Sequence, residues 1–400
     1  MRILHLSPTF PPRTFGGVTR EAFLLSKYLA DKGHEVTVYT TDVGNAERSR
    51  LPAVSITPNM NGIEVHYFRN MSNLLAFRHR IYLSKGILSS IRRELNKFDV
   101  VHIHAFRSFH DVIVHHYSKK YDIPYVLESH GATPRMGGLL KRSSKCLFDV
   151  TVGHRILSDA CKVIALTQTE ADQYKSMGVD EDRIEIVPNG IDLSEYVSMP
   201  QKGGFRRKYA ITQTEKIILY LARIHSIKGP DLLVRAYASL SKDLDNCRLV
   251  IVGPDEGYLS TLKRLINDLE IGPKVLLTGP LYGKDKLEAY VDADVYVLPS
   301  VYETFPVSVL EACACGTPVV VTDRCGIADL IDQEAGLKVP YDENQLRKAI
   351  GMILSNADIR KQFGDNGRNL VRMQFSWQKL VPQIEKIYAD CIANRDSSKH

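Results

Sequence analysis

Residues 295–321 read VYVLPSVYETFPVSVLEACACGTPVVV and contain a complete strand, loop, helix and strand. The runs Val295–Leu298 and Val319–Val321 are continuously apolar, which is typical of strands buried on both faces of a parallel sheet. The intervening loop leads into a helix that ends at Gly316, a residue type that favours helix ends. This stretch therefore predicts one βαβ unit of an α/β fold.

The same alternation extends in both directions along the chain. Further apolar strands are expected at 3–6, 35–39, 100–104, 125–128, 162–166, 184–187, 217–221, 249–252 and 275–277, with amphipathic helices such as 18–32 between them. Since 400 residues exceed one hydrophobic core, we predict two Rossmann-like domains, 1–195 and 206–376. A polar stretch from Asp192 to Arg207, with Pro200 and Gly203-Gly204, is interpreted as the linker. A final amphipathic helix within 377–400 is expected to pack back onto the first domain.

Composition fits a folded protein, with 44% hydrophobic and 24% charged residues. No apolar run approaches the roughly 18 residues that span a membrane, and the first eight residues do not form a signal peptide. The odd number of cysteines indicates reduced thiols and a cytoplasmic location; the seven positions are 146, 161, 247, 313, 315, 325 and 391.

The net charge of +6 is unevenly distributed. Residues 69–145 hold 14 Lys or Arg against five Asp or Glu, so the rest of the chain is slightly acidic. Such a basic zone suggests an anionic partner: a membrane surface, a lipid diphosphate or nucleic acid. A solvated surface on a soluble enzyme is the alternative.

Two carboxylates stand out in residues 295–321. Glu303 lies in the loop, and Glu311 lies about two turns later on a helix of small and apolar residues. A carboxylate in such a helix is costly unless it accepts hydrogen bonds, and sugar hydroxyls are suitable donors. A capping or salt-bridged role remains the alternative for either residue, but the two together favour ligand binding.

Ligands of parallel α/β sheets bind beyond the carboxyl ends of the strands. After strand 217–221, Arg223 and Lys228 could both bind one diphosphate, or could be two solvated surface cations. Gly16-Gly17, before the first helix, could let a ligand approach the backbone, or could form a simple turn. His130, beside Gly131 at the end of strand 125–128, could meet substrate or be structural.

Two patterns resemble metal sites. Asp292-Ala-Asp294 has a D-x-D spacing but precedes a strand, so it is expected to end a helix. His102 and His104 share one face of a strand, and His115 and His116 follow, but no third ligand has suitable spacing. We therefore expect no metal site and no cofactor.

Together these blocks resemble glycosyltransferase family 4 (glycosyl transferases group 1), a family of retaining enzymes with the GT-B fold. The resemblance covers nearly the whole chain. It is carried, in order, by Gly16-Gly17, Ser129-His130-Gly131, Val187-Pro-Asn189-Gly190-Ile-Asp192, Ala222-Arg223, Lys228-Gly229, Ile251-Val-Gly253, Ala293-Asp-Val-Tyr-Val-Leu-Pro-Ser300, the E-x7-E pair Glu303 and Glu311, and Gly316-Thr-Pro318.

The resemblance implies two Rossmann-like domains that face one another across a cleft, and it implies residue roles. Arg223 and Lys228 would bind the donor diphosphate in place of a metal. Glu311 would hold the ribose, Glu303 the transferred sugar, and His130 would lie near the anomeric centre. The backbone amides of Phe305 and Val307 would contact sugar or phosphate, and Gly16 and Gly17 would let the first loop approach the diphosphate. The chain departs from many relatives at Pro306, which replaces Gly and removes one amide donor.

The function implied is a retaining, metal-independent hexosyltransferase that uses a nucleotide-diphosphate sugar. Its acceptor would be a glycan or a lipid-linked glycan, in polysaccharide, lipopolysaccharide or glycoprotein glycan assembly. The enzyme would be cytoplasmic, with a possible peripheral contact to anionic membrane through residues 69–145. The alternatives are a GT-B nucleotide-sugar epimerase or sugar phosphorylase, and a non-catalytic nucleotide or nucleic-acid binding protein.

Overall fold

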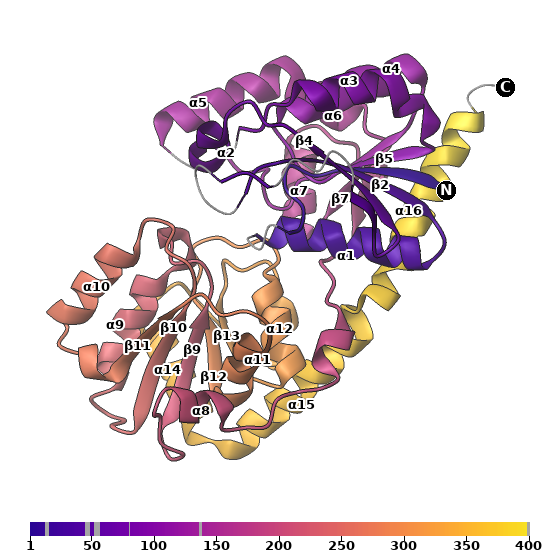
Figure 1. Ribbon diagram of the computed structural model, residues 1–400. Helices are drawn as coiled ribbons and strands as arrows, with labels where there is room; N and C mark the ends of the chain where they lie inside the picture. Colours follow the sequence, from indigo (N-terminus) through magenta and orange to yellow (C-terminus); the bar gives the residue numbers. More distant parts are fainter. Residues whose placement is uncertain (13–15, 45–48, 52–56, 80, 136–137, 398–400) are drawn as a thin grey trace. The chain divides into compact units, whose positions relative to one another are not determined.

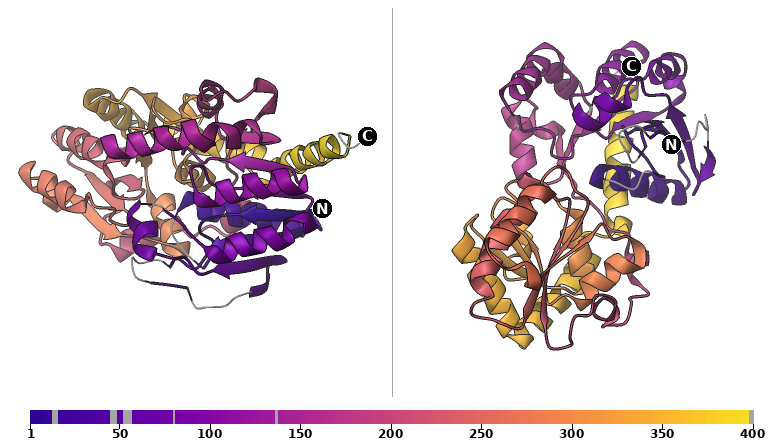
Figure 2. Two further views of the ribbon diagram at one scale, coloured as in Figure 1. Left: turned by 90° about the horizontal axis from the view of Figure 1, so that it is seen from above. Right: turned by 60° about the vertical axis from the view of Figure 1, so that its left-hand side comes forward.

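The computed structural model describes residues 1–12, 16–44, 49–51, 57–79, 81–135 and 138–397. The chain divides into two compact units, Met1–Gly190 with Trp377–His400, and Ile191–Ser376. In each unit a largely parallel sheet lies between helices, as Figures 1 and 2 show. The α/β class and the two Rossmann-like halves predicted from the sequence are confirmed.

The sheet of the first unit has the order β3-β4-β2-β1-β5-β6-β7-β8, and only the β3–β4 pair is antiparallel. The chain runs outward from β1 in one direction and from β5 in the other, so the topological switch point lies between these two strands. The elements of this unit are β1 (Arg2–Leu6), α1 (Gly17–Asp31), β2 (Glu35–Thr41), β3 (Thr57–Met60), β4 (Ile63–Phe68), α2 (Asn73–His79), α3 (Lys85–Glu94), η1 (Leu95–Lys97), β5 (Val100–Ile103), α4 (Phe109–Tyr121), β6 (Tyr125–Glu128), α5 (Leu139–Phe148), the π-helix η2 (Asp149–Gly153), α6 (His154–Ser158), β7 (Lys162–Ala165), α7 (Gln168–Ser176), η3 (Glu181–Arg183), β8 (Ile184–Ile186) and α16 (Trp377–Ser397).

Alternation along the strands divides the core of this unit into two apolar layers. Ile3, Val100 and Val126 face α1 and α16, whereas Leu4 and Val101 face the layer that contains α3, α4, α6 and α7. Helices α1 and α16 lie side by side in Figure 1 and contact each other, although they belong to opposite ends of the chain. The C-terminal helix is therefore part of the first unit.

The sheet of the second unit is wholly parallel, in the order β11-β10-β9-β12-β13-β14. Its switch point lies between β9 and β12. The elements are η4 (Leu193–Tyr196), α8 (Gly204–Lys208), β9 (Lys216–Leu221), η5 (Ser226–Lys228), α9 (Pro230–Leu240), β10 (Cys247–Val252), α10 (Leu259–Asp268), η6 (Gly272–Lys274), β11 (Val275–Gly279), α11 (Gly283–Asp292), β12 (Val295–Leu298), α12 (Val307–Cys315), β13 (Val319–Thr322), α13 (Ala328–Ile331), β14 (Gly336–Val339), α14 (Glu343–Ser355) and α15 (Ala357–Gln374).

The stretch interpreted as a linker folds as part of the second unit. The Ile191 amide donates to the Phe375 carbonyl at 2.8 Å, and the Arg206 amide donates to the Asp292 carboxylate at 3.0 Å. Arg206 itself is buried. Polar composition suggested a free linker, but these polar groups are satisfied by the unit on which they pack.

The reduced-thiol interpretation is wrong for one pair of cysteines. Cys161, just before β7, and Cys391, on α16, form a disulfide with their Cα atoms 5.8 Å apart. The two residues are separated by 230 positions in the sequence, so spacing alone could not bring them together. Cys146, Cys247, Cys313, Cys315 and Cys325 are free thiols. The disulfide links the C-terminal helix α16 to the start of β7, a strand inside the sheet.

Candidate active site

The loops after β9 and β12 lie next to each other at the switch point of the second unit. The Val301 amide donates to the Ile227 carbonyl at 2.8 Å. Gly229, at φ 64°, packs so closely that a Cβ atom there would lie 1.9 Å from the carbonyl oxygen of Pro299. Glycine is therefore required directly after Lys228, because any side chain would separate the two loops.

This contact brings two of the predicted residues together. The Lys228 ammonium forms a hydrogen-bonded ion pair with the Glu303 carboxylate, and both side chains are largely buried. Arg223, from the same loop as Lys228, instead pairs with Glu256. The two predicted diphosphate-binding cations thus have separate carboxylate partners.

Glu311 lies on α12, with 8% of its side chain exposed. One of its oxygens accepts from the Lys286 ammonium at 2.6 Å, and the other accepts from the Tyr290 hydroxyl at 3.1 Å. Both partners are on α11. The hydrogen bonds that a carboxylate in this helix requires are therefore present within the protein. Glu303 and Glu311 are both salt-bridged, and their ligand-binding role stays a prediction.

Lys286 was missed in the sequence. Lysine is ordinarily a surface residue, and the run Lys284-Asp-Lys286 carries no sign that one of its side chains turns inward.

Phe305 is buried against Phe375, and Val307 begins α12 with Pro306 as its N-cap. As the first residue of that helix, Val307 has an amide without an intrahelical acceptor, as the proposed backbone contact requires.

The D-x-D pattern has a structural role. Asp292 ends α11 as expected, and its carboxylate accepts from the amides of Gly203 and Arg206. The Asp294 carboxylate accepts from the Ile217 amide at 2.9 Å and from the Arg206 guanidinium at 3.2 Å. Both carboxylates therefore hold the start of the second unit together.

In the first unit, Gly16 caps α1 with φ 108°, a backbone conformation that favours glycine. Among the residues that the structure describes, no side chain caps this helix end. A Cβ atom added at Gly17 would meet nothing within 4 Å. A helix N-terminus of this kind presents free backbone amides of the type that anions favour.

His130 lies in a tight turn at the end of β6 and adopts a left-handed backbone conformation, φ 49°. Glu170 on α7 holds the turn: its carboxylate accepts from the Ser129 hydroxyl at 2.6 Å, the Gly131 amide at 2.7 Å and the Leu166 amide at 2.8 Å. The Ser129 amide donates to Tyr174 at 3.0 Å. Burial raises the pKa of Glu170, and these hydrogen bonds oppose that rise.

Glu170 was also missed. The pattern Thr167-Gln-Thr-Glu170 indicates only the start of a helix, and Thr167 does cap it. The Glu170 carboxylate instead reaches the end of β6. There it stabilises the unfavourable left-handed backbone conformation of His130, the predicted sugar-binding histidine.

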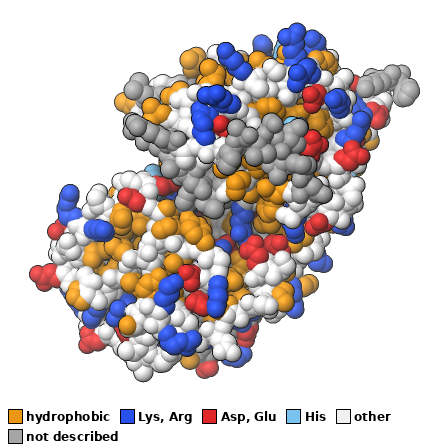
Figure 3. Space-filling view, in the orientation of Figure 1, with side chains coloured by type: hydrophobic (Ala, Val, Ile, Leu, Met, Phe, Trp, Pro, Cys, Tyr) orange, Lys and Arg blue, Asp and Glu red, His pale blue; other side chains and the backbone are white. Residues whose placement is uncertain are grey.

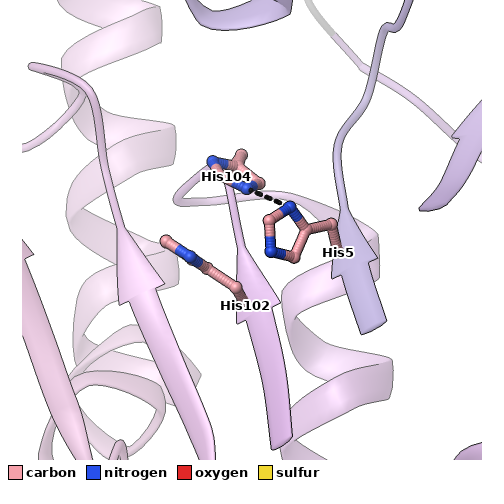
Figure 4. Close-up of side chains that lie close together, drawn as sticks. All are labelled: His5, His102 and His104. Atoms are coloured by element: carbon pink, nitrogen blue, oxygen red, sulfur yellow. Dashed lines mark hydrogen bonds between the residues drawn. The ribbon is translucent and has the colours of Figure 1, made fainter. Parts of the chain in front are cut away.

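His130 belongs to a buried cluster with three further histidines and a carboxylate. Figure 4 shows His5 from β1 pointing toward His104, which directly follows β5, and His102 on β5 itself. His104 lies 3.3 Å from His130 and 3.3 Å from His5 between ring nitrogens. Burial lowers the pKa of His102 to about 3 and holds His5 and His104 well below their usual values. It raises the pKa of Glu128 to about 7.

The sequence did not reveal a third ligand for His102 and His104, whereas the fold supplies several. His5, His102 and His104 form one group whose nitrogens lie within 4.8 Å of one another, and His104, Glu128 and His130 form another. His115, by contrast, pairs with Asp159 at 2.8 Å. Neutral imidazoles in this arrangement are chemically able to bind a transition metal. Several of these nitrogens form hydrogen bonds with one another, with Ser26 and with Tyr388. His102 Nε2 has no hydrogen-bond partner among the described residues and lies 3.4 Å from an oxygen of Glu128.

Comparisons with known proteins agree with this architecture. The family model for glycosyl transferases group 1 matches residues 201–370, and that for glycosyltransferase family 4 matches residues 15–195. A D-inositol 3-phosphate glycosyltransferase of Pseudarthrobacter chlorophenolicus is 31% identical over 350 residues, covering 82% of this chain and 79% of that enzyme. An uncharacterized glycosyltransferase of Methanocaldococcus jannaschii is 29% identical over 402 residues, covering 97% and 98%.

Solved structures share the fold at lower identity. Anabaena HepE in complex with UDP and glucose matches with a TM-score of 0.78 and 18% identity, over 98% of this chain and 100% of that chain. The sucrose-phosphate synthase of Thermosynechococcus elongatus matches with a TM-score of 0.78 and 20% identity, over 98% and 99%. The fold is therefore that of the GT-B glycosyltransferases.

Within that class, the matched models and the 31% identical relative assign the chain more narrowly. The chain belongs to glycosyltransferase family 4 (glycosyl transferases group 1), and its activity is glycosyl transfer.

Proposed function

We propose that the protein transfers a hexose from a nucleotide-diphosphate sugar to a glycan or lipid-linked acceptor, with retention of configuration and without a metal. The observation that carries this proposal is the pairing of Lys228 with Glu303 at the switch point of the second unit, with Glu311 on the helix that follows. Lys228 and Glu303 lie at strand ends, where ligands of this fold bind, and this supports roles for them at the diphosphate and the sugar hydroxyls.

The two cations would stabilise the leaving group. Breaking the bond between sugar and diphosphate leaves negative charge on the leaving oxygen, which preorganised cations and amides stabilise. Arg223 and Lys228 would supply the cations, and the amides of Phe305 and Val307 would supply further donors. The ion pair with Glu303 holds Lys228 in place before the donor arrives. The leaving phosphate would take the acceptor proton, so no protein base is assigned.

Glu303 and Glu311 would bind the transferred sugar and the ribose. A carboxylate oxygen accepts more than one hydrogen bond, so Glu311 retains capacity for ribose hydroxyls beside Lys286 and Tyr290. From the first unit, His130 would meet the sugar, and the start of α1 at Gly16-Gly17 would approach the diphosphate. Similarity to a structure solved with UDP and glucose supports UDP as the first nucleotide to test.

The first experiment is binding of UDP, GDP and ADP in the presence of EDTA, followed by thermal unfolding. One nucleotide should raise the unfolding temperature of the wild type and should fail to do so for Glu311→Ala. A shift that requires added divalent metal would overturn metal independence. NMR of the sugar released from the matching nucleotide sugar then reports retention or inversion. Formation of an epimerised nucleotide sugar would favour the epimerase alternative, and binding without any turnover would favour a non-catalytic role.

A peripheral contact with anionic membrane is the second part of the proposal. Helix α5 and the π-helix after it expose three apolar side chains, Leu139, Leu147 and Val150, at 83%, 66% and 76%. The basic residues Arg142 and Lys145 lie on the same helix. Figure 3 shows Lys and Arg side chains beside apolar ones on the first unit. Apolar and basic groups together favour an anionic lipid surface. Among the described residues, no helix is long and apolar enough to cross a membrane.

Cosedimentation with vesicles tests this contact. Vesicles that contain phosphatidylglycerol should bind the wild type at low salt, and the double variant Leu139→Ser/Leu147→Ser should bind several-fold less. Vesicles of phosphatidylcholine alone provide the charge control. Equal binding of wild type and variant, or no binding at low salt, would contradict the membrane contact.

A further inference from the structure

The ends of three adjacent strands place ionisable side chains on the face covered by α1 and α16. His5 follows Ile3 on β1, His102 follows Val100 on β5, and Glu128 follows Val126 on β6, each two residues after an apolar residue of that face. His5 is directly opposite His102 in the sheet register. All three are buried, and the proposed reaction uses none of them.

The positions of the protons in this cluster follow from Ser26 on α1. Its hydroxyl has one hydrogen, which it donates to the Ala22 carbonyl at 2.6 Å. The same oxygen lies 2.8 Å from His5 Nδ1. The oxygen must therefore accept at this contact, and His5 carries its proton on Nδ1.

The protonated nitrogen of His104 follows from that of His5. Its Nε2 lies 3.3 Å from the protonated Nδ1 of His5, so Nε2 is without a proton, because two N–H groups do not face each other. Burial keeps the imidazole neutral, which leaves its proton on Nδ1. That N–H is directed at His130 Nε2, 3.3 Å away.

His130 Nε2 is consequently an acceptor, and the proton of His130 lies on Nδ1. Nδ1 lies 3.1 Å from an oxygen of Glu128, an ion-pair distance at which a carboxylate can accept that proton. The second oxygen of Glu128 lies 3.4 Å from His102 Nε2, whose other nitrogen is 2.5 Å from the Tyr388 hydroxyl. Assignments made from Ser26 and from Glu128 therefore agree on the same tautomer of His130.

We propose that Glu128 is a positioning residue that holds His130 in the Nδ1–H tautomer and leaves Nε2 to accept a hydrogen bond from a hydroxyl of the transferred sugar. The inference rests on the proposed function, which assigns His130 to the sugar. It makes His130 a neutral acceptor, neither an acid nor a cation. In the complex the sugar hydroxyl replaces the His104 N–H at His130 Nε2.

The test measures tautomers directly, without substrate. Long-range ¹H–¹⁵N NMR of the full chain with ¹⁵N-labelled histidine, at pH 8, reports which nitrogen of each ring carries the proton, and His130→Gln identifies the signals of His130. Wild type should show His5, His104 and His130 protonated on Nδ1. Glu128→Gln, whose amide oxygen still accepts, should keep the His130 tautomer, whereas Glu128→Leu should shift it toward Nε2–H.

A matched control is available on β4. Glu64 accepts from His66 Nε2 at 2.7 Å, so Glu64→Leu removes a carboxylate from another histidine of the same unit. This variant should leave the His130 signals unchanged. Protonation of His130 on Nε2 in the wild type would overturn the proposal, and that measurement stands even if Glu128→Leu does not fold. An unchanged tautomer in folded Glu128→Leu would overturn it as well.

Kinetics separates this inference from the proposed function. With UDP-glucose as the probe and UDP release as the readout, Glu128→Leu should lower kcat/KM by about tenfold, and Glu128→Gln should recover most of it. Equal activity of Glu128→Leu and wild type would contradict the positioning role. If wild type releases no UDP while the tautomers are as assigned, the choice of donor fails and the Glu128–His130 relationship remains.

Discussion

Lys228 and Glu303, which are 75 residues apart in the sequence, form an ion pair between the loops after β9 and β12. Only 12% of the lysine side chain and 18% of the glutamate side chain are exposed. The pair is thus placed at the switch point of the sheet and shielded from screening by solvent.

Replacement of Lys228 tests its part in donor binding. Lys228→Ala should weaken UDP binding by roughly 10- to 100-fold, because a hydrogen bond to a charged group contributes about 1.5–3 kcal/mol. Isothermal titration calorimetry with UDP measures the effect. Lys208, which pairs with Asp285 on the surface, provides the matched control, and Lys208→Ala should leave the affinity unchanged. Equal losses in both variants would show a general electrostatic effect instead of a specific contact.

The Lys286–Glu311 pair should contribute to the stability of the second unit. With 14% and 8% of the side chains exposed, loss of one partner leaves a largely buried charge. Lys286→Met should therefore lower the free energy of unfolding by about 3–5 kcal/mol, measured by urea denaturation. The double variant Lys286→Met/Glu311→Leu should recover most of this loss, since no unpaired charge remains. A double variant as unstable as the single one would contradict this account.

His110 should make the protein sensitive to acid. It is buried on α4, neither ring nitrogen has a hydrogen-bond partner among the described residues, and burial lowers its pKa from 6.5 to about 4. Below pH 6.5 the unfolded chain gains a proton here that the folded chain does not take until about pH 4. The contribution of neutral His110 to the free energy of unfolding is therefore fully present above pH 6.5 and is lost as the pH falls toward 4. At pH 5 the loss from this one group is about 2 kcal/mol.

His110→Leu removes this proton uptake. Urea denaturation at pH 7.5 and pH 5 should show a difference in unfolding free energy that is about 2 kcal/mol smaller in the variant than in wild type. His79→Leu, at an exposed histidine of the same unit, should retain the wild-type difference. A pH dependence unchanged in His110→Leu would sink the assignment.

The disulfide between Cys161 and Cys391 should stabilise the first unit. A crosslink of this kind contributes about 2–4 kcal/mol, largely by restricting the unfolded chain. Dithiothreitol should lower the urea midpoint of the wild type and should leave Cys161→Ser/Cys391→Ser unaffected. Non-reducing peptide mass spectrometry identifies the linked peptides. A wild type with the same midpoint in both conditions would show that the bond contributes no stability.

Much of the fold was predictable because its strands are buried on both faces. The strand within 217–221 and its neighbours are continuous apolar runs, and the observed β9 spans Lys216–Leu221. The strands not predicted are short or peripheral. The hairpin strand β4, Ile63–Phe68, alternates polar and apolar residues, and β14, Gly336–Val339, has only four residues.

The residues of the candidate site that belong to sequence motifs could be predicted. Those that reach the site only through packing between distant elements could not. Arg223, Lys228, Glu303 and Glu311 were identified by type and position. Their partners Glu256 and Lys286 have no local signature, because an ion pair between distant elements depends on packing. Similarly, His5 opposite His102 could be found only after the β1–β5 register was known.

The whole second unit is inserted into the first between Gly190 and Trp377. During synthesis it is completed before the ribosome makes α16, which supplies Tyr388 to the histidine cluster and Cys391 to the disulfide. The first half of the chain to emerge is therefore the last to reach its final structure. A truncation that removes only α16 should leave the second unit intact. It should deprive the sheet of the first unit of one of the two helices, α1 and α16, that pack on one face.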